Sequence, residues 1–300
     1  MKDLRTRLIH IHRCRGITRR SIRRLLQVDP TLKSIYYYSP TQFSKLLNIP
    51  QKNATIFYQD LHNDRIFNQL LLDQNHYSII SLVDENYPFM LKTIKDAPIV
   101  LYALGNVSIL DKTPSLSVIG TRKPSKEAMA KIEYIVAPLI KDDWIVISGM
   151  ARGIDSFAHR LTLNYHGETI AVLGGGFQHI YPKENVGLFQ QITQKGLVLS
   201  EYPPDTSPKP YYFPERNRVI SGLSFGTLVI EATEKSGTLI TVDQALDQGK
   251  EVYAVPGSPL IPQTRGCHQM IRDGAKLVAT SQDIIEDWEN IGENWKKIKT

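Results

Sequence analysis

The pattern of apolar positions along the chain changes at about residue 76. In residues 1–75 apolar side chains recur three or four positions apart, the spacing that places them on one face of a helix. Further along, short β-branched runs alternate with stretches of helical spacing, which is typical of βαβ units around a parallel sheet. The pattern therefore predicts a small all-helical domain over residues 1–75 and an α/β domain over residues 76–300.

Within the helical part, polar capping residues precede the apolar positions. Thr18 follows Gly16-Ile17 and can cap a helix that carries Ile22. A second cap-like residue opens residues 39–49, and residues 53–72 form one longer amphipathic stretch. Two short helices joined at a Gly-Ile turn, with arginines following, resemble a helix-hairpin-helix or sterile-alpha-motif (SAM) module.

The α/β part contains six short apolar runs that we expect to form strands. They are residues 116–119, 144–147, 169–173, 197–199, 227–230 and 251–255. Ahead of them, residues 77–106 predict an additional strand, a turn at Tyr87-Pro88, a short helix and a further strand that extend the sheet at its edge.

Each main strand ends in a turn of small residues, and in an open α/β sheet such turns gather at the carboxyl edge, where ligands bind. The turns contain Gly120, Gly149, the triplet Gly174-Gly175-Gly176 and Ser236-Gly237. A tight turn uses glycine whether or not a ligand binds, but four such turns together favour a ligand-binding edge. The Ser236-Gly237 turn also opens a helix after a buried strand, which builds an anion site from backbone N–H groups and the helix dipole.

Cationic side chains accompany these turns. Arg122 follows the first strand, Arg152 the second and Lys183 the third, while Arg216, Asn217 and Arg218 lie together at the expected mouth of a helix. This placement predicts that the bound anion is a phosphate. Aromatic residues are interleaved with the cations, and Tyr211 and Tyr212, in a Pro-flanked loop, are the best candidates for exposure. Phosphate contacts combined with base stacking are typical of proteins that bind single-stranded nucleic acid with little sequence preference.

The distribution of charge is consistent with a polyanionic partner. Residues 1–75 hold 13 lysines and arginines against 5 acidic residues, a balance of +8, whereas the remaining 225 residues hold 23 against 25. The whole net charge of +6 therefore resides in the first quarter of the chain. Such asymmetry indicates a nucleic-acid partner or, with equal weight on charge alone, a solvated helical surface.

Missing motifs argue against several classes of protein. No apolar run approaches the roughly 18 residues of a membrane span, and the N-terminus lacks the apolar core of a signal peptide, so we expect a cytoplasmic protein without membrane contact. Cys14 and Cys267 are isolated single cysteines in the sequence, which predicts reduced thiols. The chain has neither GxGxxG nor GxxxxGK[ST], and no HExxH or Cys/His cluster, so we expect no NAD, ATP or metal cofactor. Asp155 and His159 lie four apart without a third partner, and we predict no catalytic residue.

Eight segments, in order, resemble the bacterial DNA-processing protein A (DprA/Smf) family. They are SVIGTRKPS, VISGMARGIDSFAH, AVLGGGFQHIYPKEN, LSEYPP, FPERNRVISGLS, IEATEKSGTLITVDQAL, VYAVPGS and GCHQMIRDGAKLV, within about residues 78–285. The resemblance implies an extended Rossmann-like domain that binds single-stranded DNA without nucleotide hydrolysis. It further implies that the protein protects incoming strands in natural transformation and loads the RecA recombinase. The implied phosphate pocket uses Arg122, Lys183, Arg216, Asn217, Arg218, Ser236 and Gly237.

The resemblance also implies a homodimer formed through the last part of the α/β domain. The residues expected at the interface are His268, Met270, Ile271 and Leu277. Periodicity alone favours packing of these apolar side chains onto their own sheet. Two other functions remain open: a nucleotide-cleaving phosphoribohydrolase, although SGTLITVDQ lacks the catalytic glutamate of that class, and a scaffold that recruits recombinase with little DNA affinity of its own.

Overall fold

A computed structural model describes residues 3–299, with the backbone alone described over residues 293–299. The chain divides into two compact units. The first comprises residues 1–87 with 98–102, and the second comprises residues 88–97 with 103–300. The first unit therefore continues past the expected boundary at residue 75. One reason is that Arg5 bonds the Asp84 carboxylate at 2.9 Å and the Ile79 carbonyl at 2.6 Å.

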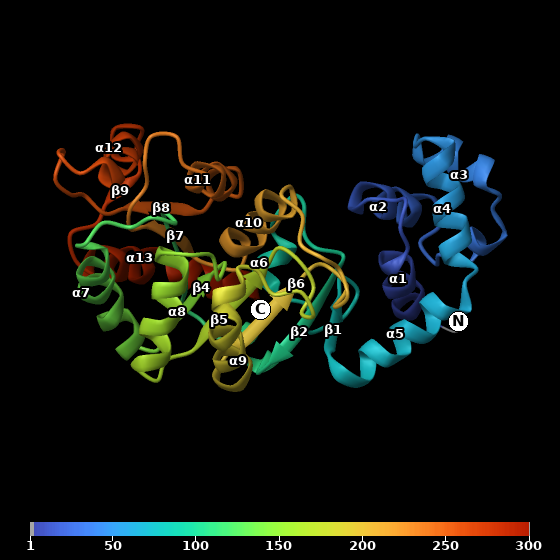
Figure 1. The fold of residues 1–300 in the computed structure, drawn as a ribbon, viewed down its shortest axis with the longest axis horizontal. Helices are drawn as coiled ribbons and strands as arrows, with labels where there is room; N and C mark the ends of the chain where they lie inside the picture. The colour runs from blue at the N-terminus through green and yellow to red at the C-terminus, as the bar shows by residue number, and fades with distance from the viewer. Residues whose placement is uncertain (1–2, 300) are drawn as a thin grey trace. The chain divides into compact units, whose positions relative to one another are not determined.

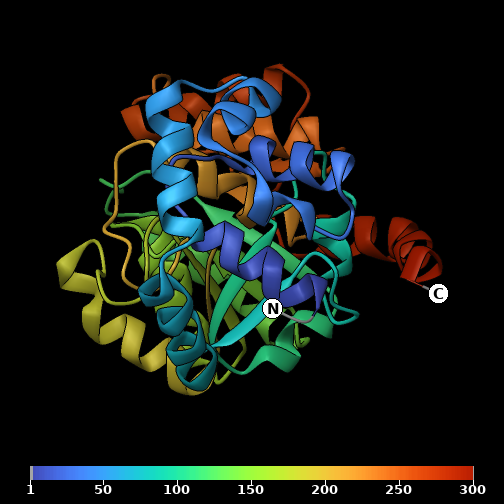
Figure 2. The same cartoon turned by 90° about the vertical axis from the view of Figure 1, so that its right-hand side faces the viewer.

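The first unit consists mainly of short helices, coloured blue to cyan in Figures 1 and 2. Its elements are α1 (Leu4–Arg13), α2 (Arg19–Val28), η1 (Ser34–Tyr37), α3 (Pro40–Leu47), α4 (Gln51–Leu61), α5 (Asp64–His76) and β1 (Ser78–Ser81). Thr18 caps α2 by accepting from the Ser21 amide, as the sequence predicts. Ser39 and Gln42 form a capping box at the start of α3. These caps satisfy backbone N–H groups that lack partners in the first helical turn.

The long amphipathic stretch over residues 53–72 is two helices rather than one. Helix α4 ends at Leu61, and the Asn63 side chain accepts a hydrogen bond from the Arg65 amide at 3.0 Å to cap α5. Asparagine favours such a cap because its short amide competes with the helical backbone for hydrogen bonds. Phe57 of α4 packs edge-on against Phe43 of α3, with ring centroids 4.8 Å apart.

The second unit is an α/β domain. In chain order its elements are α6 (Phe89–Lys92), β2 (Val100–Gly105, which begins in the first unit), η2 (Val107–Asp111), β3 (Ser115–Ile119), α7 (Ala128–Lys141), β4 (Ile145–Ser148), α8 (Ile154–Asn164), β5 (Thr169–Leu173), η3 (Lys183–Asn185), α9 (Val186–Lys195), β6 (Leu197–Ser200), α10 (Tyr212–Gly222), β7 (Gly226–Val229), α11 (Thr238–Asp247), β8 (Glu251–Ala254), η4 (Pro262–Thr264), α12 (Arg265–Arg272), β9 (Lys276–Leu277) and α13 (Gln282–Lys299).

The strands of this unit lie in the order β2-β6-β5-β4-β3-β7-β8-β9. All the pairings from β6 to β9 are parallel. Strands β3 to β6 progress outward in one direction, and the chain then returns to place β7 on the other side of β3. Figure 1 shows β6, β5, β4, β7 and β8 following one another from right to left. The order of a doubly wound sheet reverses at such a point, and the crevice there is where ligands bind. The predicted α/β fold with a Rossmann-like parallel sheet is confirmed.

Helices α7, α8 and α13 contribute to a core on one face of this sheet. The three helices contribute Ile132, Ile154 and Ile284, respectively. These side chains pack with strand residues such as Val118 and Leu228, and all five are fully buried. Parallel strands that are buried on both faces become nearly continuous apolar runs, which explains why the sequence shows them so clearly. The core fixes the carboxyl ends of β3 and β7 side by side.

Candidate nucleic-acid interface

A cavity of about 570 Å³ opens where β3 and β7 end. Its walls come from the turn after β3, the middle of α10 and the start of α11. A smaller cavity of about 240 Å³ shares Arg122, Phe213 and Arg216 with it and adds Arg152 and Tyr181. The two cavities together form the candidate site, and they lie at the switch point predicted for ligands.

Arg122 is an exposed cation of this site. It lines both cavities, and within the described residues its side chain has no ion pair or hydrogen bond. The backbone of the preceding residue, in contrast, is anchored, because the Thr121 amide bonds the Glu231 carbonyl at 2.7 Å and the Ile154 amide bonds the Thr121 carbonyl at 3.3 Å. A guanidinium on an anchored turn can bind a phosphate bidentately.

Arg216 is buried and forms part of the cavity lining. Its guanidinium donates to the Gly149 carbonyl at 2.6 Å and to the Val172 carbonyl, at the ends of β4 and β5. A Cβ at Gly149 would lie 2.6 Å from that guanidinium, so only glycine fits. Burial lowers the pKa of Arg216 to about 10, with nearby Asp155 opposing the shift and Arg122 adding to it. Arg216 therefore remains charged at neutral pH and adds positive potential to the cavity.

Arg218 does not line either cavity. It is buried, with its Nη2 2.5 Å from Glu201 Oε2 and its Nε 3.4 Å from Asp96 Oδ2. This corrects the expectation that both arginines of the RNR segment lie at a helix mouth around one anion. Helix α10 begins at Tyr212, so the segment lies past its first turn, and side chains two positions apart on a helix point in different directions. Asn217 does line the larger cavity, and its Oδ1 accepts from Arg216 Nε at 3.2 Å.

Arg152 and Lys183 lie near the site with different surroundings. Arg152 lines the smaller cavity, but it is paired with Glu184, and its Nη2 donates to Oε2 at 3.0 Å. Lys183, the first residue of η3, is exposed and lines neither cavity. Its contact with DNA therefore stays a prediction.

The start of α11 supplies the polar end of the larger cavity. Ser236 Oγ accepts from the Thr238 amide at 3.2 Å, and a Cβ at Gly237 would meet no atom within 4 Å. This end is therefore open to a ligand, and it carries the partial positive charge of a helix N-terminus. Gly120 differs, because a Cβ there would lie 2.6 Å from the Ile154 side chain, so its role is to permit close packing.

Aromatic side chains flank the cavities to different extents. Tyr211 is 55% exposed, as the sequence predicts, and Tyr181 is 50% exposed. Tyr212 is only half-exposed because it stacks on Tyr202, with ring centroids 3.9 Å apart. No sequence pattern singles out Tyr202, and Lys123, which lines both cavities, is not among the predicted site residues. The signal for Lys123 was its place beside Arg122 in the same turn.

Two groups considered as possible chemical centres are engaged internally. Asp155 lies in the cavity wall, where its Oδ2 accepts from the Gly149 amide at 3.1 Å, and burial raises its pKa. His159 is fully buried against Thr169 Oγ1 at 2.7 Å, and burial lowers its pKa to about 3. Among the residues the structure describes, no cluster of His, Cys, Asp and Glu could hold a metal ion. Within the same residues, no helix combines the length and apolar character that crossing a bilayer requires.

The residues expected at a dimer interface differ in accessibility. Leu277 is 46% exposed and Ile271 is half-buried, whereas Met270 is 5% exposed. His268 Nε2 lies 3.0 Å from the Gly257 carbonyl. Met270 therefore packs within its own unit, which corrects the expectation that its side chain is available to a second copy.

Comparison with known proteins identifies the family. Residues 78–289 match the family described as DNA recombination-mediator protein A. The chain is 43% identical to DNA processing protein DprA of Bacillus subtilis, over 69% of this chain and 70% of the relative. It is also 43% identical to DNA processing protein DprA of Streptococcus pneumoniae, over 70% of this chain and 73% of the relative. It is 38% identical to Protein Smf of Escherichia coli over 75% and 60%.

Two solved structures resemble this one. The X-ray structure of S. pneumoniae DprA covers 93% of this chain and 95% of that one, with 33% identity and a TM-score of 0.79. A structure of DprA from Helicobacter pylori, described for its mode of binding single-stranded DNA, covers 71% and 96%, with 29% identity and a TM-score of 0.64. The resemblance in sequence motifs is thus confirmed over the α/β domain and in the fold, and the chain belongs to the DprA/Smf family of DNA-processing proteins.

Proposed function

We propose that this protein binds single-stranded DNA at the cavities beyond the carboxyl ends of β3 and β7, through the phosphate backbone and without a covalent step. The observation that carries the proposal is Arg122, an exposed cation without an internal partner among the described residues, on a turn whose backbone is anchored at Thr121 and Ser125. The helix start at Gly237 and the charge of Arg216 add positive potential to the same cavity. The printed description of the H. pylori relative supports this ligand.

The aromatic residues favour a single strand over a duplex. Tyr181 and Tyr211 are about half-exposed beside the cations, and unpaired bases can stack on such rings, whereas bases within a duplex cannot. Lys209 lies 5.9 Å from the Tyr211 ring centroid, which places a cation and a stacking surface together. We therefore expect binding with little sequence preference.

Fluorescence anisotropy with labelled single- and double-stranded oligonucleotides tests the proposal. We expect tight binding of the single strand, weaker binding of the duplex, and affinity that falls linearly with salt on logarithmic axes because bound counterions are released. Equal affinity for both forms, or affinity independent of salt, would contradict it. Release of a free base from a nucleoside monophosphate, lost on mutation of this cavity, would instead establish the phosphoribohydrolase alternative.

The role we propose for this binding is recombination of incoming DNA, in which the protein protects single strands and loads the RecA recombinase on them. The family description as a recombination mediator supports this role. RecA filament assembly on single strands, followed with and without the protein, tests it, and an Arg122→Ala variant separates loading from mere recruitment. A scaffold would retain its effect in that variant, whereas a DNA-binding loader would lose it.

A further inference from the structure

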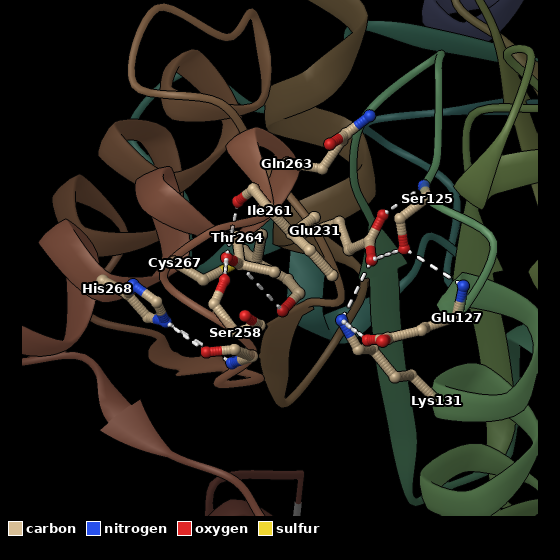
Figure 3. A network of polar contacts seen from close by, with 12 residues as sticks. Ser125, Glu127, Lys131, Glu231, Ser258, Ile261, Gln263, Thr264, Cys267 and His268 are labelled. Atoms are coloured by element: carbon tan, nitrogen blue, oxygen red, sulfur yellow. Dashed lines mark hydrogen bonds and ion pairs between the residues drawn. The ribbon is translucent and has the colours of Figure 1, made fainter.

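Glu231 occupies an unusual position beside the candidate site. It follows β7, its side chain is completely buried, and it reaches the turn after β3 rather than solvent (Figure 3). A buried carboxylate is costly unless charge and hydrogen bonds compensate it. The groups that compensate Glu231 therefore indicate what it holds in place.

The compensating groups belong to the turn that carries Arg122 and to the helix that follows. The Ser125 amide donates to Glu231 Oε2 at 2.8 Å, and the Ser125 hydroxyl donates to Oε1 at 2.6 Å. Lys131, in the first turn of α7, donates to Oε1 at 3.0 Å and supplies the opposite charge. The Glu231 carbonyl accepts from the Thr121 amide at 2.7 Å. One residue thus anchors residues 121 and 125, on both sides of Arg122.

A more distant loop makes a third attachment. Gln263 Nε2 donates to the Lys123 carbonyl at 3.4 Å. The neighbouring Thr264 hydroxyl bonds the Ser258 carbonyl at 2.7 Å within its own loop (Figure 3). The backbone of the turn is therefore held at residues 121, 123 and 125, while the Arg122 side chain remains without an internal partner among the described residues. A fixed backbone beneath a solvent-facing cation reduces the entropy that is lost when a phosphate binds.

We propose that Glu231 is the positioning residue of this site: its buried carboxylate and its carbonyl hold the 121–125 turn so that Arg122 is presented to a phosphate. The inference rests on the proposed binding of single-stranded DNA and deepens it. Glu231 acts through the turn and does not touch the DNA. Ser125 is the link between them, since both its amide and its hydroxyl contact the carboxylate.

A double-mutant cycle between Ser125 and Arg122 tests this coupling. Ser125→Ala removes the hydroxyl contact and keeps the amide contact, and we expect about fivefold weaker binding of a labelled single strand. In an Arg122→Ala background the same change should have no further effect, because the cation that it positions is absent. Ser125→Thr, which keeps the hydroxyl, should restore binding. Ser117→Ala is the matched control: it removes a buried β3 hydroxyl, bonded to Thr227 Oγ1 at 2.8 Å, away from the turn, and should leave affinity unchanged.

A second variant changes the carboxylate itself. Glu231→Gln keeps the size of the side chain but replaces one carboxylate oxygen with an NH2 group. That group is a hydrogen-bond donor that faces another donor, so we expect about tenfold weaker binding of the single strand. If this variant does not fold, Ser125→Ala decides the question alone. Wild-type affinity in Ser125→Ala, or an equal loss in the presence and absence of Arg122, would overturn the positioning role while leaving DNA binding established. A wild-type protein that does not bind single strands would overturn the proposed function and this inference together.

Discussion

Replacement of Arg122 by alanine is the most direct test of the binding site. The side chain lines both cavities and has no internal hydrogen bond or ion pair among the described residues. Its removal should therefore affect the ligand rather than the fold. The charge of Arg122 also contributes to lowering the pKa of buried Arg216, which means that the two guanidinium groups repel each other. The variant should thus unfold at the wild-type temperature or slightly above it.

The loss of affinity can be estimated from one charged phosphate contact. Such a hydrogen bond contributes about 1.5–3 kcal/mol, which corresponds to a Kd that is about 10- to 150-fold higher. One phosphate contact fewer should also reduce the slope of log affinity against log salt by about 0.7 for a single strand. Loss of affinity and reduction of slope must occur together if Arg122 contacts a phosphate.

Anisotropy titrations at a series of salt concentrations measure both quantities. Lys126→Ala is a matched control, because Lys126 is an exposed cation four residues further along that lines neither cavity. We expect that control to retain affinity near the wild-type value. The reasoning is refuted if Arg122→Ala binds like the wild type, or if the two variants lose affinity and salt dependence equally.

Three further outcomes follow from the structure. Arg218→Ala should lower the free energy of unfolding by about 3–5 kcal/mol in urea titrations, because it breaks a buried ion pair by removing its cation. Arg152→Ala, which breaks an exposed pair, should have no measurable effect; equal effects would contradict this. Burial lowers the pKa of His159 to about 3, so below pH 6.5 the unfolded chain binds more protons than the folded one and stability falls as the pH drops. Between pH 7 and 5 the wild type should lose about 2 kcal/mol more than His159→Asn, and parallel pH profiles would exclude this contribution. If the exposed surface around Leu277 forms the expected dimer, Leu277→Asp should give a folded monomer in light scattering. The Met270→Asp variant should instead unfold, because the Met270 side chain is buried. A wild-type protein that is monomeric at tens of micromolar would refute the dimer.

The fold could be predicted because its signals are local. Buried parallel strands leave apolar runs in the sequence, and the hydroxyl of Thr18 predicts the start of the helix that it caps. The position of a cation relative to a cavity depends instead on helix phase and burial, which no local pattern reveals. Arg216 and Arg218 are two residues apart, yet one lines the cavity and the other forms a buried ion pair. The contact of Glu231 with the turn after β3 could not be predicted either, because its partner Ser125 is 106 positions away in the sequence.

The arrangement of charge would allow a domain with almost no net charge to bind a polyanion, as we propose. Buried Arg218 and partly buried Lys131 are paired with carboxylates, and Arg152 at the surface is paired with Glu184. Their fields are largely cancelled at short range. Arg122 lacks such a partner among the described residues, so its potential extends into the cavity, where Arg216 and the start of α11 reinforce it. We therefore expect affinity at this edge to depend on which cations are left unpaired rather than on how many cations the domain contains.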